Sequence, residues 1–182
     1  MSRIFIDPGH GGPRAPGAIG RGGTMEKTVN LAISLLLGEM LRTYQNIEVR
    51  LSRTGDTAIS ILERYNMSNR WNANWFVSIH QNSDGPTAVG IETLAFSKTS
   101  QGFRLAQAVQ RSMIQATKER DRGVKIRPDL GVLRGTKAPA ILVESGYISN
   151  LATEALLKTD QYQRVIAGAI SDGIVSFAGL RR

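Results

Sequence analysis

The sequence contains no cysteine, and only two of its 182 residues are histidine. The lack of cysteine excludes disulfides, thiolate metal ligands and a cysteine nucleophile. Any bound metal ion must therefore be held by histidine and carboxylate side chains. The chain also lacks an apolar run close to the roughly 20 residues that span a membrane, and its N-terminus lacks the charged-then-apolar pattern of an export signal. We expect neither a membrane span nor a signal peptide in this chain.

Acidic residues are the minority among the charged side chains, with 15 Asp and Glu against 23 Lys and Arg and a net charge of +8. This balance favours polyanionic surroundings such as nucleic acid, acidic membranes or an anionic cell wall, and charge alone does not choose among them. Five basic residues gather between Lys118 and Arg127, where a solvated loop rim is an equally good interpretation. The length and the 41% apolar content fit one domain.

Apolar periodicity predicts strands and helices that alternate along the chain. Strands are predicted at residues 4–6, 47–51, 75–79, 89–96 and 140–143, with a shorter extended piece at 131–134. Helices are predicted at residues 24–41, with Thr24 as the N-cap, and at 59–72, 103–117 and 154–178. The alternation predicts a single α/β domain over residues 1–182, with a twisted, mostly parallel sheet and helices on both of its faces.

A glycine-rich loop over residues 8–24 connects the first predicted strand to the first predicted helix, and it holds seven glycines. Open α/β sheets place their ligand-binding loops at this position. A phosphate-binding loop is a weaker alternative, because the run from Pro8 to Gly12 fits neither GxGxxG nor a P-loop.

The two histidines each follow a predicted buried strand. His10 comes after Ile4–Ile6 and Asp7-Pro8-Gly9, and His80 ends the apolar run that starts at Trp75. Each has a simpler alternative, a turn residue for His10 and a hydrogen-bonded core histidine for His80. Because parallel strands bring their C-terminal ends to one edge of a sheet, the pair favours a shared metal ion.

Two glutamates complete the predicted site. Glu26 lies in the first turn of the predicted 24–41 helix, where the helix dipole alone also favours a carboxylate. Glu144 ends the apolar strand 140–143, where an unpaired carboxylate is costly unless it has a function or a partner. A salt bridge with Arg134 is the alternative for Glu144, and Glu92 is a reserve candidate on the predicted strand 89–96.

Asp7, three residues before His10, can accept the second ring N–H of a ligating histidine and so fix its tautomer. Capping of the loop backbone is an equal alternative for Asp7. With His10, Glu26 and His80 as ligands, a tetrahedral Zn²⁺ keeps one open position for water. Glu144 is then available as the general base, and this division of roles suits amide hydrolysis.

Motifs that contain these residues resemble the catalytic domain of zinc-dependent N-acetylmuramoyl-L-alanine amidases of the family 3 type, found in bacterial autolysins, cell-division amidases and phage endolysins. The similarity extends along nearly the whole chain, in family order, through the segments 6–12, 16–18, 26–32, 51–54, 76–80, 122–124, 132–134 and 139–150. By position, His10, Glu26 and His80 match the family's zinc ligands, and Glu144 matches its catalytic glutamate.

The resemblance implies one Zn²⁺ per chain and cleavage of the amide between the lactyl group of N-acetylmuramic acid and L-alanine in peptidoglycan. It further implies action at the bacterial cell wall, extracellular or periplasmic, and the chain is expected to be a trimmed domain or a phage endolysin. We expect a monomer without a nucleic-acid partner. Asn82 and Arg134 are the predicted substrate contacts, on a polar rim that stabilises the oxyanion. Gln81, where the family has a small residue, is expected in the groove wall without touching a ligand.

The segment from Phe96 to Phe103 is short, whereas partner-controlled division amidases carry a long insertion there with a self-blocking helix. We therefore expect an open site without such a helix. A binding module with a degraded site is the alternative function, and it predicts retention of wall polymers or nucleic acid without turnover. The presence of all four site residues favours the enzyme.

Overall fold

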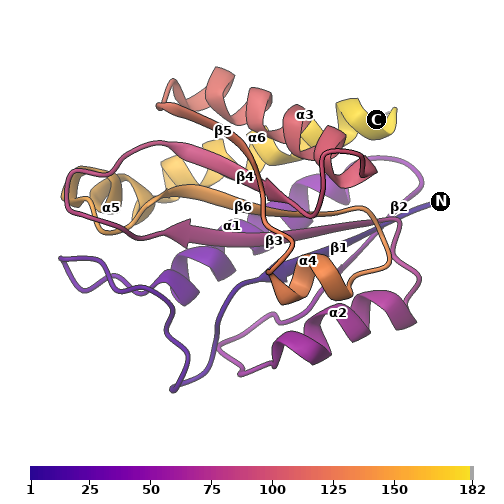
Figure 1. The fold of residues 1–182 in the computed structure, drawn as a ribbon, viewed down its shortest axis with the longest axis horizontal. Helices are drawn as coiled ribbons and strands as arrows, with labels where there is room; N and C mark the ends of the chain where they lie inside the picture. The colour runs from indigo at the N-terminus through magenta and orange to yellow at the C-terminus, as the bar shows by residue number, and fades with distance from the viewer. Residues whose placement is uncertain (181–182) are drawn as a thin grey trace.

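The computed structural model describes residues 1–180 and contains a six-stranded sheet between two layers of helices (Figure 1). The strands are β1 (Ser2–Pro8), β2 (Ile47–Leu51), β3 (Trp75–Asn82), β4 (Ile91–Ala95), β5 (Asp121–Ile126) and β6 (Ala140–Tyr147). Their order across the sheet is β2-β1-β3-β6-β4-β5, and all neighbours are parallel except β4 and β6. The predicted α/β class with a mostly parallel sheet is confirmed.

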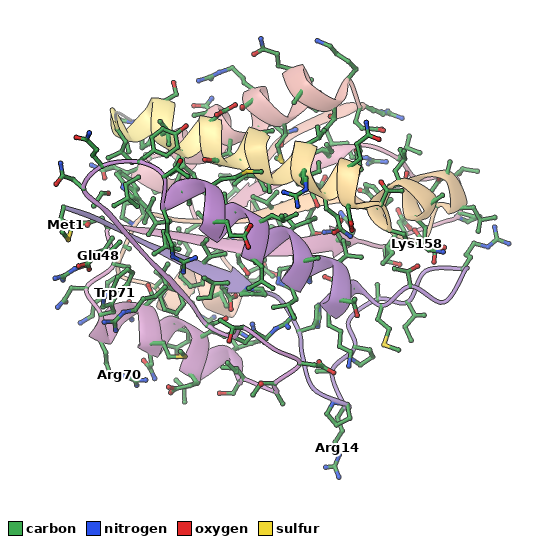
Figure 2. The ribbon with its side chains drawn as sticks, turned by 180° about the vertical axis from the view of Figure 1, so that it is seen from behind. Met1, Arg14, Glu48, Arg70, Trp71 and Lys158 are labelled. Carbon is green, nitrogen blue, oxygen red and sulfur yellow. The ribbon has the colours of Figure 1, made fainter. Side chains whose placement is uncertain are left out.

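Helices cover both faces of the sheet, as predicted. One face carries α1 (Glu26–Leu41), α3 (Gln101–Thr117) and α6 (Asp160–Ala178). Figure 2, which views the molecule from behind, shows α1 and α6 lying across this face. The opposite face carries α2 (Ile61–Arg70) and the short α4 (Gly131–Gly135), while α5 (Leu151–Leu157) follows β6. Within residues 1–180, none of the helices combines the length and apolarity needed to cross a membrane.

The alternation of side chains along the central strands divides the core into two parts. Ile141 and Val143 of β6 belong to the larger core beneath α1, α3 and α6, whereas Ala140 and Leu142 belong to a smaller core beneath α2 and α4. Because successive side chains of a strand point to opposite faces, this alternation directs Glu144 to the α2 and α4 face. Glu26 of the candidate site comes instead from α1, on the opposite face.

The prediction of an extended piece at residues 131–134 is wrong, because this segment forms α4. Val132 and Leu133 are both buried, and both pack into the smaller core. Consecutive strand residues would point to opposite faces, so one helical turn is needed to bury both on the same side. The carbonyl of Leu130 accepts the N–H groups of Leu133 and Arg134, which closes this turn.

Three further details differ from the prediction. Part of the basic segment 118–127 forms the edge strand β5, and the predicted helix 154–178 is divided into α5 and α6 at Lys158 and Thr159. Helix α1 is capped by Met25 without a side-chain hydrogen bond, not by Thr24. The reason is that Thr24 belongs to the preceding loop, where its carbonyl accepts the N–H of Gly20 and its own N–H is bound by Glu154.

Candidate metal and catalytic site

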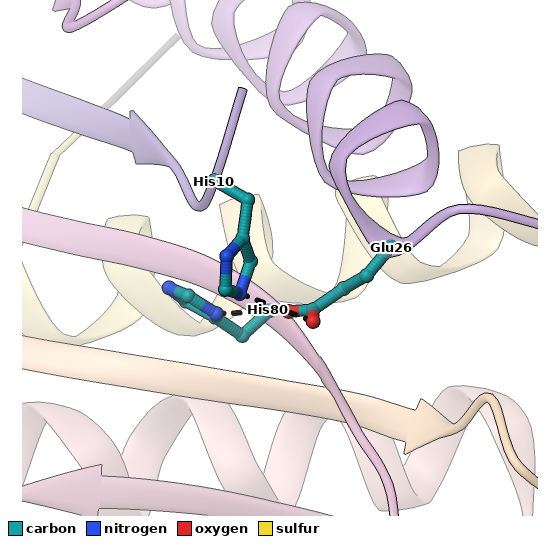
Figure 3. A group of neighbouring side chains, drawn as sticks. All are labelled: His10, Glu26 and His80. Carbon is teal, nitrogen blue, oxygen red and sulfur yellow. Dashed lines mark hydrogen bonds and ion pairs between the residues drawn. The ribbon is translucent and has the colours of Figure 1, made fainter. Parts of the chain in front are cut away.

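The structure brings together the three residues predicted as metal ligands, from three separate elements (Figure 3). His10 follows β1, His80 lies near the end of β3, and Glu26 is the first residue of α1. The parallel pairing of β1 with β3 aligns the two histidine-bearing ends. Glu26 Oε1 lies 2.9 Å from His80 Nδ1, and Glu26 Oε2 lies 3.1 Å from His10 Nε2.

These atoms suit a small divalent cation. One nitrogen from each imidazole and one carboxylate oxygen all lie within 4.8 Å of one another. Zn²⁺ binds such atoms at about 2.0–2.2 Å, which separates neighbouring tetrahedral donors by about 3.3 Å. Two histidines and one carboxylate also form a donor set typical of catalytic zinc, because a fourth position stays open. The residues present therefore fit the ion that the sequence predicted.

The electrostatics of the triad favour a positive charge next to Glu26. Burial alone raises the pKa of this carboxyl, but hydrogen bonds with His10 and His80 outweigh it and hold the pKa well below its usual range. For His80, burial alone lowers the pKa. The hydrogen bond with Glu26 and the charge of Glu144 outweigh this effect and raise the pKa of His80 above its usual value. Glu26 is thus kept ionised, which is the state that binds a metal.

Two glycines allow the ligands to approach so closely. A Cβ on Gly9 would lie 2.3 Å from atoms of the His80 ring, and one on Gly17 would lie 2.5 Å from Glu26 Oε2. Gly17 also has a φ of +73°, in the left-handed region that favours glycine. His10 itself has a φ of +61°, so its backbone needs support from the surrounding structure.

Two buried arginines supply that support. Arg64 donates hydrogen bonds to the carbonyls of His10, at 2.6 Å, and Pro8, at 2.7 Å. Arg53 donates to the carbonyls of Pro8, at 3.0 Å, and Gly9, at 2.9 Å. The arginines are only 5% and 4% exposed, although their positions in the sequence resemble those of ordinary surface charges. Sequence reasoning missed this clamp, and the only available signal was that Arg53 belongs to a recognisable motif.

Asp7 lies beneath the site but does not have the predicted partner. Its carboxylate accepts hydrogen bonds from Arg64 Nη1, at 2.7 Å, Ser52 Oγ, at 2.6 Å, and Ser78 Oγ, at 2.8 Å. Among the described residues, no hydrogen bond joins Asp7 to a histidine ring, so the expectation that it fixes a ligand's tautomer is wrong. The buried cation of Arg64 takes up its charge instead, because burying both groups unpaired would be costly.

Glu26 is held on several sides. Its carboxylate accepts the backbone N–H of Ala18, at 2.8 Å, and of Gln81, at 3.1 Å, as well as the side-chain amide of Asn30, at 3.2 Å. The Gln81 side chain in turn donates to Asn30 Oδ1. The expectation for Gln81 is therefore wrong, because it is 3% exposed, lies in this network and touches Glu26.

The glycine-rich loop before Glu26 is anchored by a residue that the sequence did not reveal. Glu154 of α5 accepts hydrogen bonds from the N–H groups of Gly22, at 2.7 Å, and Thr24, at 3.0 Å. These bonds lower the pKa of Glu154 against the opposing effect of its burial. A Cβ on Gly20 would lie 2.4 Å from the Glu154 carboxyl carbon. Glu154 thus ties the loop to α5.

Glu144 lies next to the triad with its carboxylate only partly satisfied. It pairs in register with His80 of β3 on one side and with Glu92 of β4 on the other. Its Oε2 is buried and has no hydrogen-bond partner within residues 1–180. The ion pairs among the described residues include none between Glu144 and Arg134, which was the alternative interpretation.

The surroundings of Glu144 favour its protonated form near neutral pH. Burial raises its pKa to about 7, with further contributions from the negative charges of Glu26 and Glu92. The charges of His80 and Arg127 act in the opposite direction but are smaller effects than burial. A buried carboxyl with a pKa close to the working pH has the properties of a general acid and base.

The two predicted substrate contacts lie on different elements. Asn82, at the end of β3, donates through Nδ2 to Glu92 Oε1 at 2.9 Å. Arg134 is exposed in the last turn of α4. The structure therefore places one of them in a polar cluster with Glu92 and the other on the surface of the α2 and α4 face.

Comparison with known proteins agrees with this geometry. The sequence profile described as N-acetylmuramoyl-L-alanine amidase matches residues 4–176. The sporulation-specific N-acetylmuramoyl-L-alanine amidase of Bacillus subtilis is 37% identical over 184 residues, which cover 100% of this chain and 70% of the relative. The endolysin of Bacillus phage SPP1 is 32% identical over 98% of this chain and 67% of the relative.

Solved structures of the same enzymes superpose closely. The N-acetylmuramoyl-L-alanine amidase from Clostridium difficile 630 has a TM-score of 0.95 and 37% identity over 98% of this chain and 97% of that chain. The catalytic domain of CwlV from Bacillus (Paenibacillus) polymyxa has a TM-score of 0.93 and 36% identity over the full length of both chains. On the combined match of sequence and fold, this chain belongs to the N-acetylmuramoyl-L-alanine amidase family.

Proposed function

We propose that this protein is a zinc-dependent hydrolase that cleaves the amide between N-acetylmuramic acid and L-alanine in bacterial peptidoglycan. The observation that carries the proposal is the convergence of two imidazoles and one carboxylate within 4.8 Å, next to a buried glutamate with an unpaired oxygen. The family match supports the same bond as substrate.

His10, Glu26 and His80 hold one Zn²⁺ per chain in this proposal. A bound Zn²⁺ polarises a carbonyl and lowers the pKa of water from about 15.7 to about 7. The hydrogen bonds from Ala18, Asn30 and Gln81 fix the Glu26 carboxylate, and the arginine clamp fixes the backbone of His10. The protein thereby sets the ligand positions before the ion arrives.

Glu144 acts first as base and then as acid. In its ionised form it removes a proton from the attacking water as the water oxygen bonds to the carbonyl carbon. The same proton passes to the alanine nitrogen as the carbon–nitrogen bond breaks. The products are the lactyl carboxylic acid and the free amine, so atoms and charges balance. A pKa of about 7 suits both transfers.

Asn82 and Arg134 contact the substrate in this proposal, as hydrogen-bond donors on the polar rim that stabilise the developing oxyanion. The Asn82 amide already donates to Glu92, so its orientation is defined before substrate binds. Arg134 is exposed and belongs to α4, on the face toward which Glu144 is directed.

The partner of this site is peptidoglycan, not nucleic acid, and the protein acts at the bacterial cell wall, extracellular or periplasmic, as a monomer. Residues 1–182 form one amidase catalytic domain of the autolysin or endolysin type. Residues 96–100 alone connect β4 to α3, so this connection is too short for a self-blocking helix. The proposed site is accordingly open to substrate.

The decisive experiment is mass analysis of the fragments released from a defined muropeptide. Amide cleavage gives a free L-alanine amine and an intact sugar, whereas cleavage between sugars gives a different mass and would contradict the substrate assignment. Metal analysis is expected to find about one zinc per chain, and chelation is expected to stop lysis. Retention of peptidoglycan without any cleavage would favour the binding-module alternative.

A further inference from the structure

An apolar cavity of about 380 Å³ opens beside the two histidines, on the side of the site formed by α2 and α4. Its apolar walls come from four segments of the chain and comprise Ala15, Ile59, Ile61, Leu130, Val132 and Leu142. His10 and His80 form part of the same lining. The volume lies at the lower end of the range of about 300–1,000 Å³ for small-molecule sites.

Ile61 is notable among the wall residues because it is 58% exposed. It packs against Gly131 at the start of α4, where an added Cβ would lie 2.7 Å from Ile61 Cγ2. A large aliphatic side chain at the mouth of a cavity offers apolar surface that a ligand can cover. The glycine opposite keeps the two helices close while leaving the cavity open.

The other side of the site has a different chemistry. Glu144, Glu92 and Asn82 are polar, and none of them belongs to the cavity lining. Glu144 and Glu92 sit on β6 and β4, toward the β5 edge of the sheet, whereas His10 follows β1. Arg127 contributes a positive charge near both glutamates. The cavity side of the triad is thus mainly apolar, and the two charged residues in its lining, Asp7 and Arg64, neutralise each other as an ion pair, whereas the other side carries the two glutamates.

The substrate has the same asymmetry about its scissile bond. The nitrogen side continues into a stem peptide with charged groups, and the carbonyl side continues into the lactyl and acetamido methyl groups of muramic acid. Glu144 has to reach the nitrogen to deliver its proton. The substituent on the carbonyl carbon must then point away from Glu144, which is toward the cavity.

We propose that this cavity is the subsite for the acyl half of the substrate, with the lactyl and acetamido methyl groups of N-acetylmuramic acid against Ile61 and its apolar neighbours. The inference rests on the proposed amidase function and adds the direction in which the substrate lies. Ile61 is a specificity-determining residue in this arrangement. The Ser60 hydroxyl, also in the lining, is a polar group beside the apolar walls.

The test compares Ile61→Ser with Leu62→Ser in the zinc-loaded enzyme. Both side chains are 58% exposed and adjacent in the first turn of α2, but only Ile61 lines the cavity. Each variant is assayed on N-acetylmuramoyl-L-alanyl peptide and on acetyl-L-alanyl peptide, which lacks the lactyl ether and the sugar. Loss of one or two buried methylene contacts, at about 0.8 kcal/mol each, predicts an about four- to fifteenfold lower kcat/KM for Ile61→Ser on the muramoyl substrate.

On the acetyl substrate, wild type, Ile61→Ser and Leu62→Ser are expected to have the same kcat/KM. Shortening the stem peptide to L-alanine alone should leave the Ile61→Ser penalty unchanged. The inference is overturned if the two variants behave alike on the muramoyl substrate, or if the penalty follows the length of the stem peptide. A wild-type enzyme that cleaves no amide at all would instead refute the proposed function.

Free N-acetylmuramic acid provides a second measurement that needs no turnover. Its dissociation constant for the zinc-loaded protein is expected to rise severalfold in Ile61→Ser and to stay unchanged in Leu62→Ser. Equal dissociation constants in all three proteins would contradict the assignment. Zinc content measured in parallel should be the same in each, since Ile61 does not touch a ligand.

Discussion

The metal-ligand triad and Glu144 lie on neighbouring elements but differ in how their polar atoms are satisfied. Glu26 is bound by both histidines, two backbone amides and one side-chain amide. Glu144 keeps a buried oxygen that has no hydrogen-bond partner in the described part of the chain. A group that holds an ion benefits from a fixed position, whereas a group that exchanges protons needs a free atom and a poised pKa. This contrast is consistent with the proposed roles, metal binding for Glu26 and proton transfer for Glu144.

The largest effect is expected from breaking the triad itself. His80→Ala removes one of three ligands, so the protein should lose its zinc and its activity should fall to background. Inductively coupled plasma analysis and a muropeptide assay measure both quantities. Zinc at one equivalent in the His80→Ala protein would contradict the ligand assignment.

Glu144→Gln tests the proton-transfer role proposed for Glu144, in contrast to the metal-binding role of the triad. This variant should retain one zinc per chain and lose activity by about 10²–10⁴-fold, because the amide cannot accept the proton of water. Glu92→Gln is the matched control, since Glu92 pairs directly with Glu144 in the sheet. Its activity is expected to change by less than about tenfold, as it lacks the proton-transfer role. Full activity in Glu144→Gln would remove Glu144 as the base.

Arg53→Lys tests whether zinc binding by the triad depends on the arginine clamp. Lysine keeps the positive charge but cannot donate to several carbonyls in the fixed geometry of a guanidinium. Zinc affinity is expected to fall by about 10–100-fold, as for other groups that orient metal ligands. Arg50→Lys is the control, because Arg50 is exposed and stacks over Trp71 away from the site. Equal zinc affinities in the two variants would show that the clamp does not position His10.

The pH dependence follows from the raised pKa of Glu144. The base is active when ionised, so kcat/KM should fall about tenfold per unit as pH drops below about 7. The folded protein favours the neutral form, hence the stabilising contribution of Glu144 is present below pH 4.5 and is lost as pH rises through about 7. In metal-free protein, Glu144→Gln should therefore be more stable than wild type at pH 8 by about 1–3 kcal/mol, with little difference at pH 4. Urea unfolding at both pH values measures this change, and an equal difference at both would contradict it.

The smallest effect is expected at the loop anchor. Glu154→Gln leaves one acceptor for the two loop amides, so the free energy of unfolding should fall by about 1 kcal/mol. Zinc affinity should fall only severalfold, since Glu154 acts through the loop before Glu26. Glu63→Gln, at an exposed ion pair with Arg70, is the control and should change neither quantity. Loss of all zinc in Glu154→Gln would mean that the loop contributes more than its hydrogen bonds indicate.

The sequence allowed the prediction of the elements that place the triad, because their signals are local. Apolar runs ending in His10 and His80 mark strand exits, and strand exits of a parallel sheet converge. Glu144 was predictable for a related reason, since a carboxylate directly after an apolar run is unusual. These patterns depend on neighbouring residues and need no knowledge of the packing.

The supports of the site were not predictable in this way. Arg53 and Arg64 become buried only because the loop carbonyls of residues 8–10 turn toward them, and that turn is a tertiary feature. Helix α4 has too few residues to show a period, so it was mistaken for an extended segment. The partners of Asp7 lie 45 and 71 positions away among serines that carry no distinctive pattern.

The strand order has a consequence for how the protein is made. Strand β6, which carries Glu144, is the last strand in the sequence but inserts between β3 and β4 in the sheet. A nascent chain that stops after β5 lacks Glu144 and leaves β3 with an unpaired edge. The four site residues can therefore come together only after β6 has been synthesised.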